Sequence, residues 1–175
     1  GCDKLGVCGK EPEVAVLQDL LVYASKGISQ YARRAREQGV IDATADHFVT
    51  EALFTTVTNV NFDPLRLETI LREAARVRDQ AKALYEKACA EKGRAPEALS
   101  GPALWQPAAD LAGLIQQGQD IGIPTRINRF GPDITGLQEL LTYGLKGTAA
   151  YAKHARVLGR EDAGVYAFFH ESLDY

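Results

Sequence analysis

The stretch VAVLQDLLVYASKGISQYARRAREQG, residues 14–39, decides the fold class of this chain. Its apolar residues recur every three or four positions, which is the spacing of one face of an amphipathic α-helix. Pro12 stands near the expected first turn, and Gly39 stands where a helix end belongs. The apolar positions are Leu17, Leu20, Leu21, Ala24, Ile28, Tyr31 and Ala35. The pattern predicts one long helix that buries this face.

Two more helices are predicted before the middle of the chain. The second runs from about Thr44 or Ala45 to Thr56 and turns Phe48, Ala52 and Leu53 inward. The third begins after Asp63, a good helix cap, with Pro64 in its first turn, and it ends at Gly93. Its apolar stripe is Leu67, Leu71, Ala74, Val77, Ala81, Leu84 and Ala88. Glu68 and Arg72 form an i,i+4 pair on its wet side.

The first helix recurs 120 residues later. Leu17-Gln18-Asp19-Leu20-Leu21 returns as Leu137-Gln138-Glu139-Leu140-Leu141. Identical residues then follow in both copies: Tyr23, Lys26, Gly27, Tyr31, Ala32, Ala35, Arg36 and Gly39 return as Tyr143, Lys146, Gly147, Tyr151, Ala152, Ala155, Arg156 and Gly159. Phe48, Glu51 and Leu53 return as Phe168, Glu171 and Leu173. The chain is therefore expected to contain two related helical units.

This repeat suggests an all-α protein in four parts. Residues 1–10 form a Cys-containing loop, 11–95 a first three-helix bundle, 96–132 a Pro- and Gly-rich connector with one short helix near Ala108 to Gln117, and 133–175 the start of a second, incomplete bundle. The counterpart of the third helix would fall near residues 184–212. Because the sequence contains no Met and stops before this counterpart, we expect both ends to be cuts. The apolar face of the second unit then needs another partner, or later residues, to cover it.

Several side chains in the repeat have predicted environments. Gly27 and Gly147 lie mid-helix, where Gly costs up to about 1 kcal/mol relative to Ala, so a close helix crossing is expected at both. Tyr23, Tyr31, Tyr143 and Tyr151 are expected to be core aromatics. Cys89 is expected to be a small buried thiol, and His47, His154 and His170 are expected at solvated or edge positions. Lys26, Arg33, Arg34 and Arg36 form a basic stretch that is either the wet face of the first helix or a steering surface for an acidic electron-transfer partner.

Composition limits the classes of partner. The 175 residues are 46% hydrophobic and 25% charged, with a formal net charge of −3, which is ordinary for a globular protein. Basic residues are interspersed with acidic ones, which argues against nucleic-acid binding. No apolar run reaches the roughly 18 residues that span a bilayer, and no secretory signal is evident, so a cytoplasmic protein without a membrane partner is expected.

The first ten residues, GCDKLGVCGK, carry the candidate chemistry. Cys2 and Cys8 lie in a Gly-punctuated segment just before a helix, where thiols can bind metal with lowered pKa values. An iron–sulfur cluster needs four thiolates, and two are present here. From the residues alone, a strained small-loop disulfide or two idle thiols remain open alternatives.

Several ordered motifs resemble the hybrid-cluster proteins, also called prismane proteins or hydroxylamine reductases. These motifs are Gly6-Val7-Cys8-Gly9-Lys10, Leu17 to Leu21, Lys26-Gly27-Ile28, Leu140 to Gly147, and Tyr151 to Ala155. The resemblance covers nearly the whole chain. It implies the N-terminal helical domain of a larger oxidoreductase, in which four cysteines hold a cubane 4Fe-4S cluster that relays electrons to a hybrid iron–sulfur–oxygen cluster.

In that family, Cys2 and Cys8 match the third and fourth cysteines of the cubane motif, and the first two would precede Gly1. The hybrid cluster belongs to later domains, so no catalytic residue is assigned here, and the chain alone is not expected to reduce hydroxylamine or a related N–O species to ammonia and water. The implied partners are the remaining domains of the same protein and an electron-donor reductase. The alternative is a metal-free helical scaffold that docks a partner through the uncovered face of the second unit.

Overall fold

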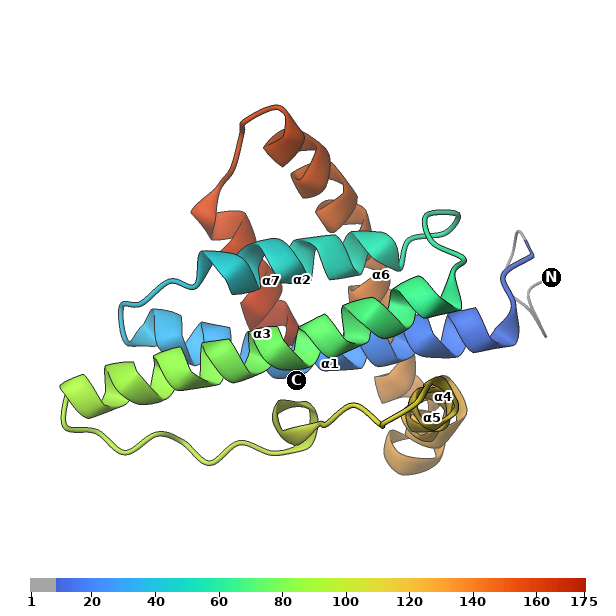
Figure 1. Cartoon of the computed structure of the whole chain (residues 1–175), viewed down its shortest axis with the longest axis horizontal. Coiled ribbons are helices and arrows are strands. Elements are labelled where there is room, and N and C mark those ends of the chain that lie inside the picture. Colours follow the sequence, from blue (N-terminus) through green and yellow to red (C-terminus); the bar gives the residue numbers. More distant parts are fainter. Residues whose placement is uncertain (1–8) are drawn as a thin grey trace.

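The computed structural model describes residues 9–175, and every regular element in that part is helical (Figure 1). The elements are α1 (Pro12–Glu37), α2 (Ala43–Thr55), α3 (Pro64–Glu91), the 3-10 turn η1 (Gly101–Leu104), α4 (Leu111–Asp120), α5 (Ile123–Phe130), α6 (Pro132–Val157) and α7 (Ala163–Leu173). The all-α class is confirmed. Within residues 9–175, no helix combines the length and the apolar character that crossing a membrane requires.

Local chemistry sets where the first three helices begin and end. The Asp42 carboxylate accepts the backbone N–H groups of Thr44 and Ala45 at 3.0 and 3.2 Å, which caps α2. Asp63 caps α3 in the same way. Gly39 ends the α1 turn with φ +83°, a left-handed conformation that favours glycine. The predicted bounds of these helices are therefore confirmed to within a few residues.

The three helices lie lengthwise beside one another, and α3 packs along most of α1 (Figure 1). Every predicted apolar position of α1 is buried, with Leu17, Leu20 and Leu21 at 0% exposure. Full burial of one such side chain contributes about 1.5–3 kcal/mol. On α3 the prediction holds except at Leu84, which is only half-buried, while the neighbouring Tyr85 is buried.

The repeat is present in the fold as well as in the sequence. Helix α6 begins and ends 120 residues after α1, and α7 begins 120 residues after α2. Asp162 caps α7 as Asp42 caps α2, by accepting the N–H groups of the second and third residues after it. Gly159, with φ +73°, repeats the left-handed end of α1 at Gly39. Two stretches of similar sequence thus form the same helix–turn–helix unit.

The second helix pair does not stand apart from the first bundle. Helix α6 packs against α2, and α7 packs against α1, while α6 and α7 contact each other only slightly. In Figure 1 both helices run across the long direction of α1 to α3. Phe169, Leu173 and Leu145 join the main core through these contacts. The first bundle therefore supplies most of the apolar surface that holds α6 and α7.

The connector contains more helix than predicted. Helix α4 lies close to the expected short helix, but α5 follows it directly. The prolines and glycines of this segment predicted a connector with one short helix, but Pro124 occupies the first turn of α5, where its missing N–H costs nothing. The predicted unit boundaries near residues 95 and 132 stay predictions.

Gly27 and Gly147 differ although they are repeat partners. A Cβ on Gly27 would overlap the carbonyl oxygen of Pro102 and lie 2.7 Å from its carbonyl carbon. The close approach predicted there exists, but the partner is the η1 turn rather than a helix. A Cβ on Gly147 would meet nothing within 4 Å, so the prediction of a crossing at Gly147 is wrong.

The four repeat tyrosines also differ between copies. Tyr31 is buried and Tyr23 is half-buried, as predicted. Tyr143 and Tyr151 are 78% and 81% exposed, so their assignment to a core is wrong in this structure. The physical reason is that α3 and η1 pack on α1, and no described element packs on the matching face of α6.

Candidate functional site

Cys2 and Cys8, the predicted cluster ligands, lie outside the described residues. The nearest described anchor is Lys10, whose ammonium donates a 2.5 Å hydrogen bond to Oε1 of Gln18. The amide of Gln18 in turn donates to the carbonyl of Asn61 at 2.9 Å. These contacts fix the entry into α1 beside the loop that precedes α3.

Cys89 is 2% exposed near the end of α3, which confirms the prediction of a buried thiol. It packs with Tyr31 and Ala35 in the last third of α1. At 1.5 Å per residue, that region lies about 30 Å along the helix from Pro12, whereas the four residues from Cys8 to Pro12 span at most about 14 Å. Cys89 therefore cannot share a metal centre with Cys8. Among residues 9–175, no group of three or more His, Cys, Asp or Glu side chains is arranged to hold a metal ion.

His170 is fully buried, so its predicted edge position is wrong. Its Nδ1 lies 3.0 Å from Oγ of Ser29 on α1, and its Nε2 lies 2.8 Å from Oδ1 of Asp46 on α2. Arg36 of α1 also donates to the Asp46 carboxylate. Burial acts to raise the pKa of Asp46, but the hydrogen bonds from His170 and Arg36 outweigh it and hold that pKa below its usual range.

This His170 network contains the residue types of a hydrolytic triad, but it is structural. Ser29, Asp46 and His170 are each exposed by 4% or less, so no substrate reaches them. Their positions on three different helices explain their role, because each hydrogen bond joins α7 to the first bundle. The repeat carried a signal for the burial of His170. With the 120-residue offset, His170 corresponds to Thr50, which is buried in α2.

The basic stretch of α1 is not simply a solvent-exposed surface, because its arginines have acidic partners. Arg33 and Arg34 both contact Oδ2 of Asp174 at 2.9 Å, and Arg34 also pairs with Glu97 at 2.6 Å. Lys26 is buried. The sequence reading missed these roles because the acidic partners lie more than 60 residues away.

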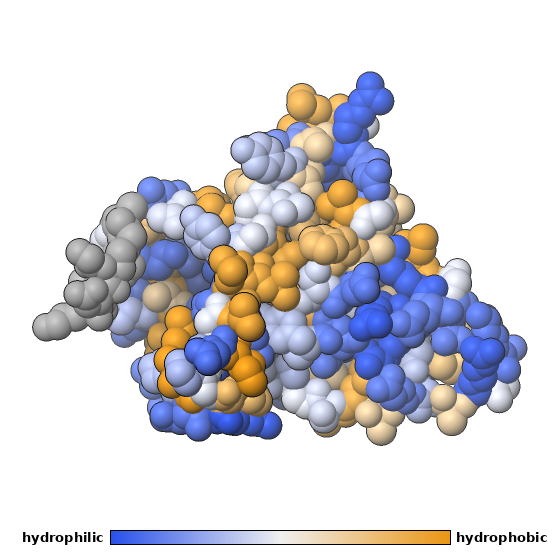
Figure 2. Space-filling model, turned by 180° about the vertical axis from the view of Figure 1, so that it is seen from behind, coloured by the Kyte–Doolittle hydropathy of each residue, from blue (hydrophilic) through white to orange (hydrophobic). Residues whose placement is uncertain are grey.

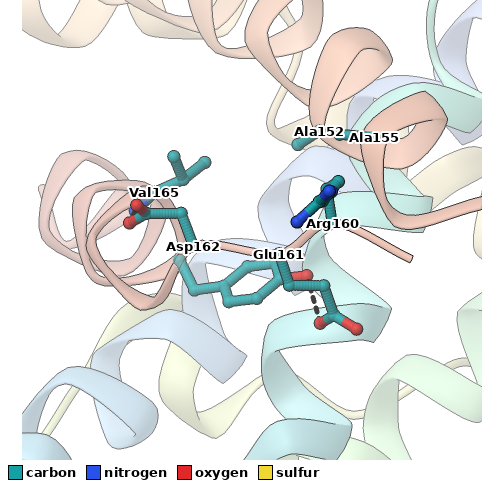
Figure 3. A pocket seen from close by; sticks show the side chains of 7 residues that line it. Ala152, Ala155, Arg160, Glu161, Asp162 and Val165 are labelled. Atoms are coloured by element: carbon teal, nitrogen blue, oxygen red, sulfur yellow. Dashed lines mark hydrogen bonds between the residues drawn. The ribbon is translucent and has the colours of Figure 1, made fainter. Parts of the chain in front are cut away.

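A pocket of about 170 Å³ lies at the turn between α6 and α7 (Figure 3). Its polar side is formed around Glu161, which accepts a 2.7 Å hydrogen bond from the hydroxyl of Tyr166, the dashed line in Figure 3. Nε2 of His47 lies 2.8 Å from the same carboxylate oxygen. Burial is the larger cause and the hydrogen bond to Glu161 the smaller cause of a raised pKa of Tyr166, which reaches about 12. This phenol is therefore a poor acid at neutral pH. His47 is half-buried and His154 is exposed, in agreement with their predicted edge positions.

An apolar groove of about 440 Å³ lies on α6 and α7, and it is here called the α6 groove. It is lined by Leu137, Leu140, Leu141, Gly144, Leu145, Thr148 and Phe168. Leu137 and Leu140 are each 68% exposed. Figure 2 shows hydrophobic side chains gathered on the face seen from behind, where α6 lies. Exposed apolar patches of this kind mark interaction surfaces.

The repeat shows what covers the matching surface in the first unit. The counterparts of Leu137, Leu140 and Leu141 are the fully buried Leu17, Leu20 and Leu21, which share one core with Leu67 and Leu71 of α3. The α6 groove is therefore the equivalent of the surface of α1 on which α3 packs. The sequence supplies the apolar side chains of this groove. They are exposed because no described element packs on that face of α6.

The fold and the exposed groove together define an all-α protein of two tandem helical units. The apolar face of the first unit is covered by α3, and the matching face of the second unit is exposed. The Prismane/CO dehydrogenase family matches residues 1–174, and the chain belongs to that family. It is 58% identical to the hydroxylamine reductase of Rhodospirillum rubrum over 98% of this chain, which is 31% of that relative. It is 52% and 51% identical to the hydroxylamine reductases of Geobacter metallireducens and Geobacter sulfurreducens, over 99% of this chain and 32% of each relative. The chain thus spans about a third of the length of the curated relatives it matches.

Proposed function

We propose that this chain is the N-terminal electron-relay part of a hydroxylamine reductase-like oxidoreductase. The observation that carries the proposal is the 58% identity, over 98% of the chain, to a relative named hydroxylamine reductase. In the whole protein, hydroxylamine would take up two electrons and two protons and give ammonia and water, and a related N–O species is the alternative substrate. Catalysis would belong to other domains, and the chain would have a cytoplasmic location and receive electrons from a separate reductase.

Cys2 and Cys8 are the proposed ligands within this sequence. As thiolates they would supply two of the four bonds that a 4Fe-4S cluster needs, with the other two from cysteines that precede Gly1. The cluster, when bound, supplies one-electron transfer. The choice of cysteines supports this, because Cys89 is buried near the end of α3, beside the last third of α1, and is too far from the start of α1 to complete a site there. The family also supports iron–sulfur chemistry in general terms.

The remaining domains of the same protein are the proposed occupants of the α6 groove. Two observations support this. The groove repeats the surface that α3 covers in the first unit, and the chain spans about a third of its relatives. A helix with an apolar stripe like that of α3 would bury Leu137 and Leu140. Such burial contributes about 1.5–3 kcal/mol for each leucine.

A metal-free docking module is the second candidate. The exposed α6 groove favours it equally, because an apolar groove can receive a separate protein as well as another domain. The two functions differ in their dependence on iron. In the second, Cys2 and Cys8 would be plain thiols, and the partner would bind equally well to iron-free protein.

Anaerobic reconstitution of the full-length protein with iron and sulfide tests the first function. We expect the broad visible absorption of an iron–sulfur cluster and a reduced-state EPR signal, with lower iron content in Cys2→Ser and Cys8→Ser. Cys89→Ser is the matched control and should keep the signal. Far-UV circular dichroism checks that each variant is folded. Full-length folded protein without iron, or unchanged iron in both N-terminal variants, would contradict the proposal.

A further inference from the structure

Three residues along one side of α6, here called the Gly147 face, are open to solvent. Tyr143, Gly147 and Tyr151 are spaced by four residues, so they follow one another along the same side of the helix. The two tyrosines are 78% and 81% exposed, and a Cβ on Gly147 would meet nothing within 4 Å. A hollow of about 400 Å³ lies beside Tyr143. None of the three residues lines the α6 groove, so the Gly147 face is a separate surface.

The matching face of the first unit is covered by the η1 turn, which lies beside α1 (Figure 1). The three counterparts on α1 are Tyr23, Gly27 and Tyr31. A Cβ on Gly27 would overlap the carbonyl oxygen of Pro102, the second residue of η1. Tyr31 is buried in the same apolar cluster as Ala103 of η1. Helix α3 thus covers one side of α1, and a short turn covers this second side.

Helix α6 contains three glycines, and only Gly147 has a glycine as its repeat counterpart. Gly136 and Gly144 correspond to Val16 and Ala24. Glycine destabilises a helix interior relative to alanine, and nothing among the described residues requires a glycine at position 147. In the first unit, the glycine is required by the close approach of a backbone carbonyl. The repeat therefore indicates that Gly147 serves a contact of the same kind.

We propose that the Gly147 face docks a short non-helical turn of the same polypeptide, from outside these 175 residues, with a backbone carbonyl placed against Gly147. A turn is favoured over a helix because packed helix axes stay about 8–10 Å apart, and because the same face of α1 receives the η1 turn. The same polypeptide is favoured because the chain spans about a third of its relatives. The inference rests on the proposed function in that it requires a longer protein.

Hydroxyl-radical footprinting of the full-length protein, read at single tyrosines by mass spectrometry, tests the inference. Tyr23 and Tyr31 report the covered face within the same protein and calibrate the oxidation rates. We expect Tyr143 and Tyr151 to be oxidised as slowly as these counterparts, at every protein concentration, and fast in the 175-residue chain, where both are exposed. Equally fast oxidation in the full-length protein overturns the inference. Protection that is lost on dilution also overturns it, because a second copy would then be the occupant.

Glycine variants of the full-length protein test the close backbone contact itself. Gly147→Leu should restore fast oxidation of Tyr143 and Tyr151, because a backbone carbonyl cannot reach the helix past the added side chain. Gly147→Ala should raise the undocked population of the turn about 5- to 150-fold, the factor that corresponds to ordinary overpacking. Gly144→Ala is the matched control, because it introduces the residue that the first unit has at Ala24, and it should leave both tyrosines protected. Protection that survives in folded Gly147→Leu overturns the inference.

Iron content and far-UV circular dichroism of the same samples separate this inference from the proposed function. Iron-loaded, folded protein with fast-oxidised Tyr143 and Tyr151 would contradict the docked turn and leave the electron relay intact. Iron-free, folded protein in which both tyrosines are protected would contradict the electron relay and support the docked turn.

Discussion

The clearest test of the packing uses the two repeat glycines, Gly27 and Gly147, as each other's control. Both lie in the interior of a 26-residue helix, so replacement by Ala brings each helix the same intrinsic gain of about 0.5–1 kcal/mol. The surroundings differ. A methyl group on Gly147 meets nothing within 4 Å, whereas one on Gly27 overlaps the Pro102 carbonyl.

The cost at Gly27 follows from the distances. The new methyl carbon would lie 2.7 Å from the carbonyl carbon of Pro102 and 3.2 Å from the amide nitrogen of Ala103. Carbon atoms pack at about 3.5–4.0 Å, so η1 has to move by roughly 1 Å. Both contacts are backbone, and no rotamer change relieves them. Overpacking of this kind costs about 1–3 kcal/mol, which outweighs the helix gain.

Thermal and urea unfolding measure the outcome. Gly147→Ala should raise the melting temperature by about 1–4 °C, because its gain is about 0.5–1 kcal/mol and about 1 kcal/mol shifts a chain of this size by roughly 2–4 °C. Gly27→Ala should lower the melting temperature, and the stability gap between the variants should be about 1–3 kcal/mol. If Gly27→Ala stabilises the chain as much as Gly147→Ala does, η1 does not pack on α1 as described.

Three further outcomes follow from the same structure. Leu20→Ala should cost about 2–5 kcal/mol in urea unfolding, whereas Leu140→Ala, its exposed repeat partner, should stay within about 0.5 kcal/mol; equal costs would mean that the α6 groove is covered. Asp46→Asn should lower stability at neutral pH by roughly 3 kcal/mol, because it leaves His170 and Arg36 without their carboxylate. The folded-state pKa of Asp46 lies below its ordinary 3.8, so its stabilising effect is present above that pH and is lost as the pH falls through the folded-state pKa. Unfolding curves of wild type and Asp46→Asn should therefore converge in acid, and a constant gap would contradict this. Asp42→Ala should cost about 0.5–2 kcal/mol through the lost α2 cap, with reduced helicity by circular dichroism; unchanged stability would show that the cap is dispensable.

Local signals in the sequence were sufficient for most of the helices. Asp63 and Pro64 mark the start of α3, and Gly39 marks the end of α1, because capping and left-handed turns depend on residues that are close in sequence. The 120-residue repeat was equally readable, and it extends to the helix bounds. Burial was harder to predict. The spacing of Leu137 and Leu140 defines an apolar face, but spacing carries no information on what packs against it.

The polar residues of the site show the same limit. His170 is buried because Ser29 and Asp46, 141 and 124 residues away in sequence, offer hydrogen bonds to both ring nitrogens. Lys26 matches the wet-face pattern of α1, and it becomes buried only because residues of α5 and α6 close over it. Cys2 and Cys8 were singled out by residue type and by family resemblance, and their role stays a prediction.

The packing of α7 on α1 and of α6 on α2 sets an order for assembly during synthesis. The first three helices leave the ribosome before the rest of the described helices, and they carry most of the buried apolar residues of the main core. The later helices then fold onto a surface that is already formed. The leucines that line the α6 groove are open to water, and such surface on a nascent protein is prone to aggregation. This face is therefore where a chaperone would be needed most.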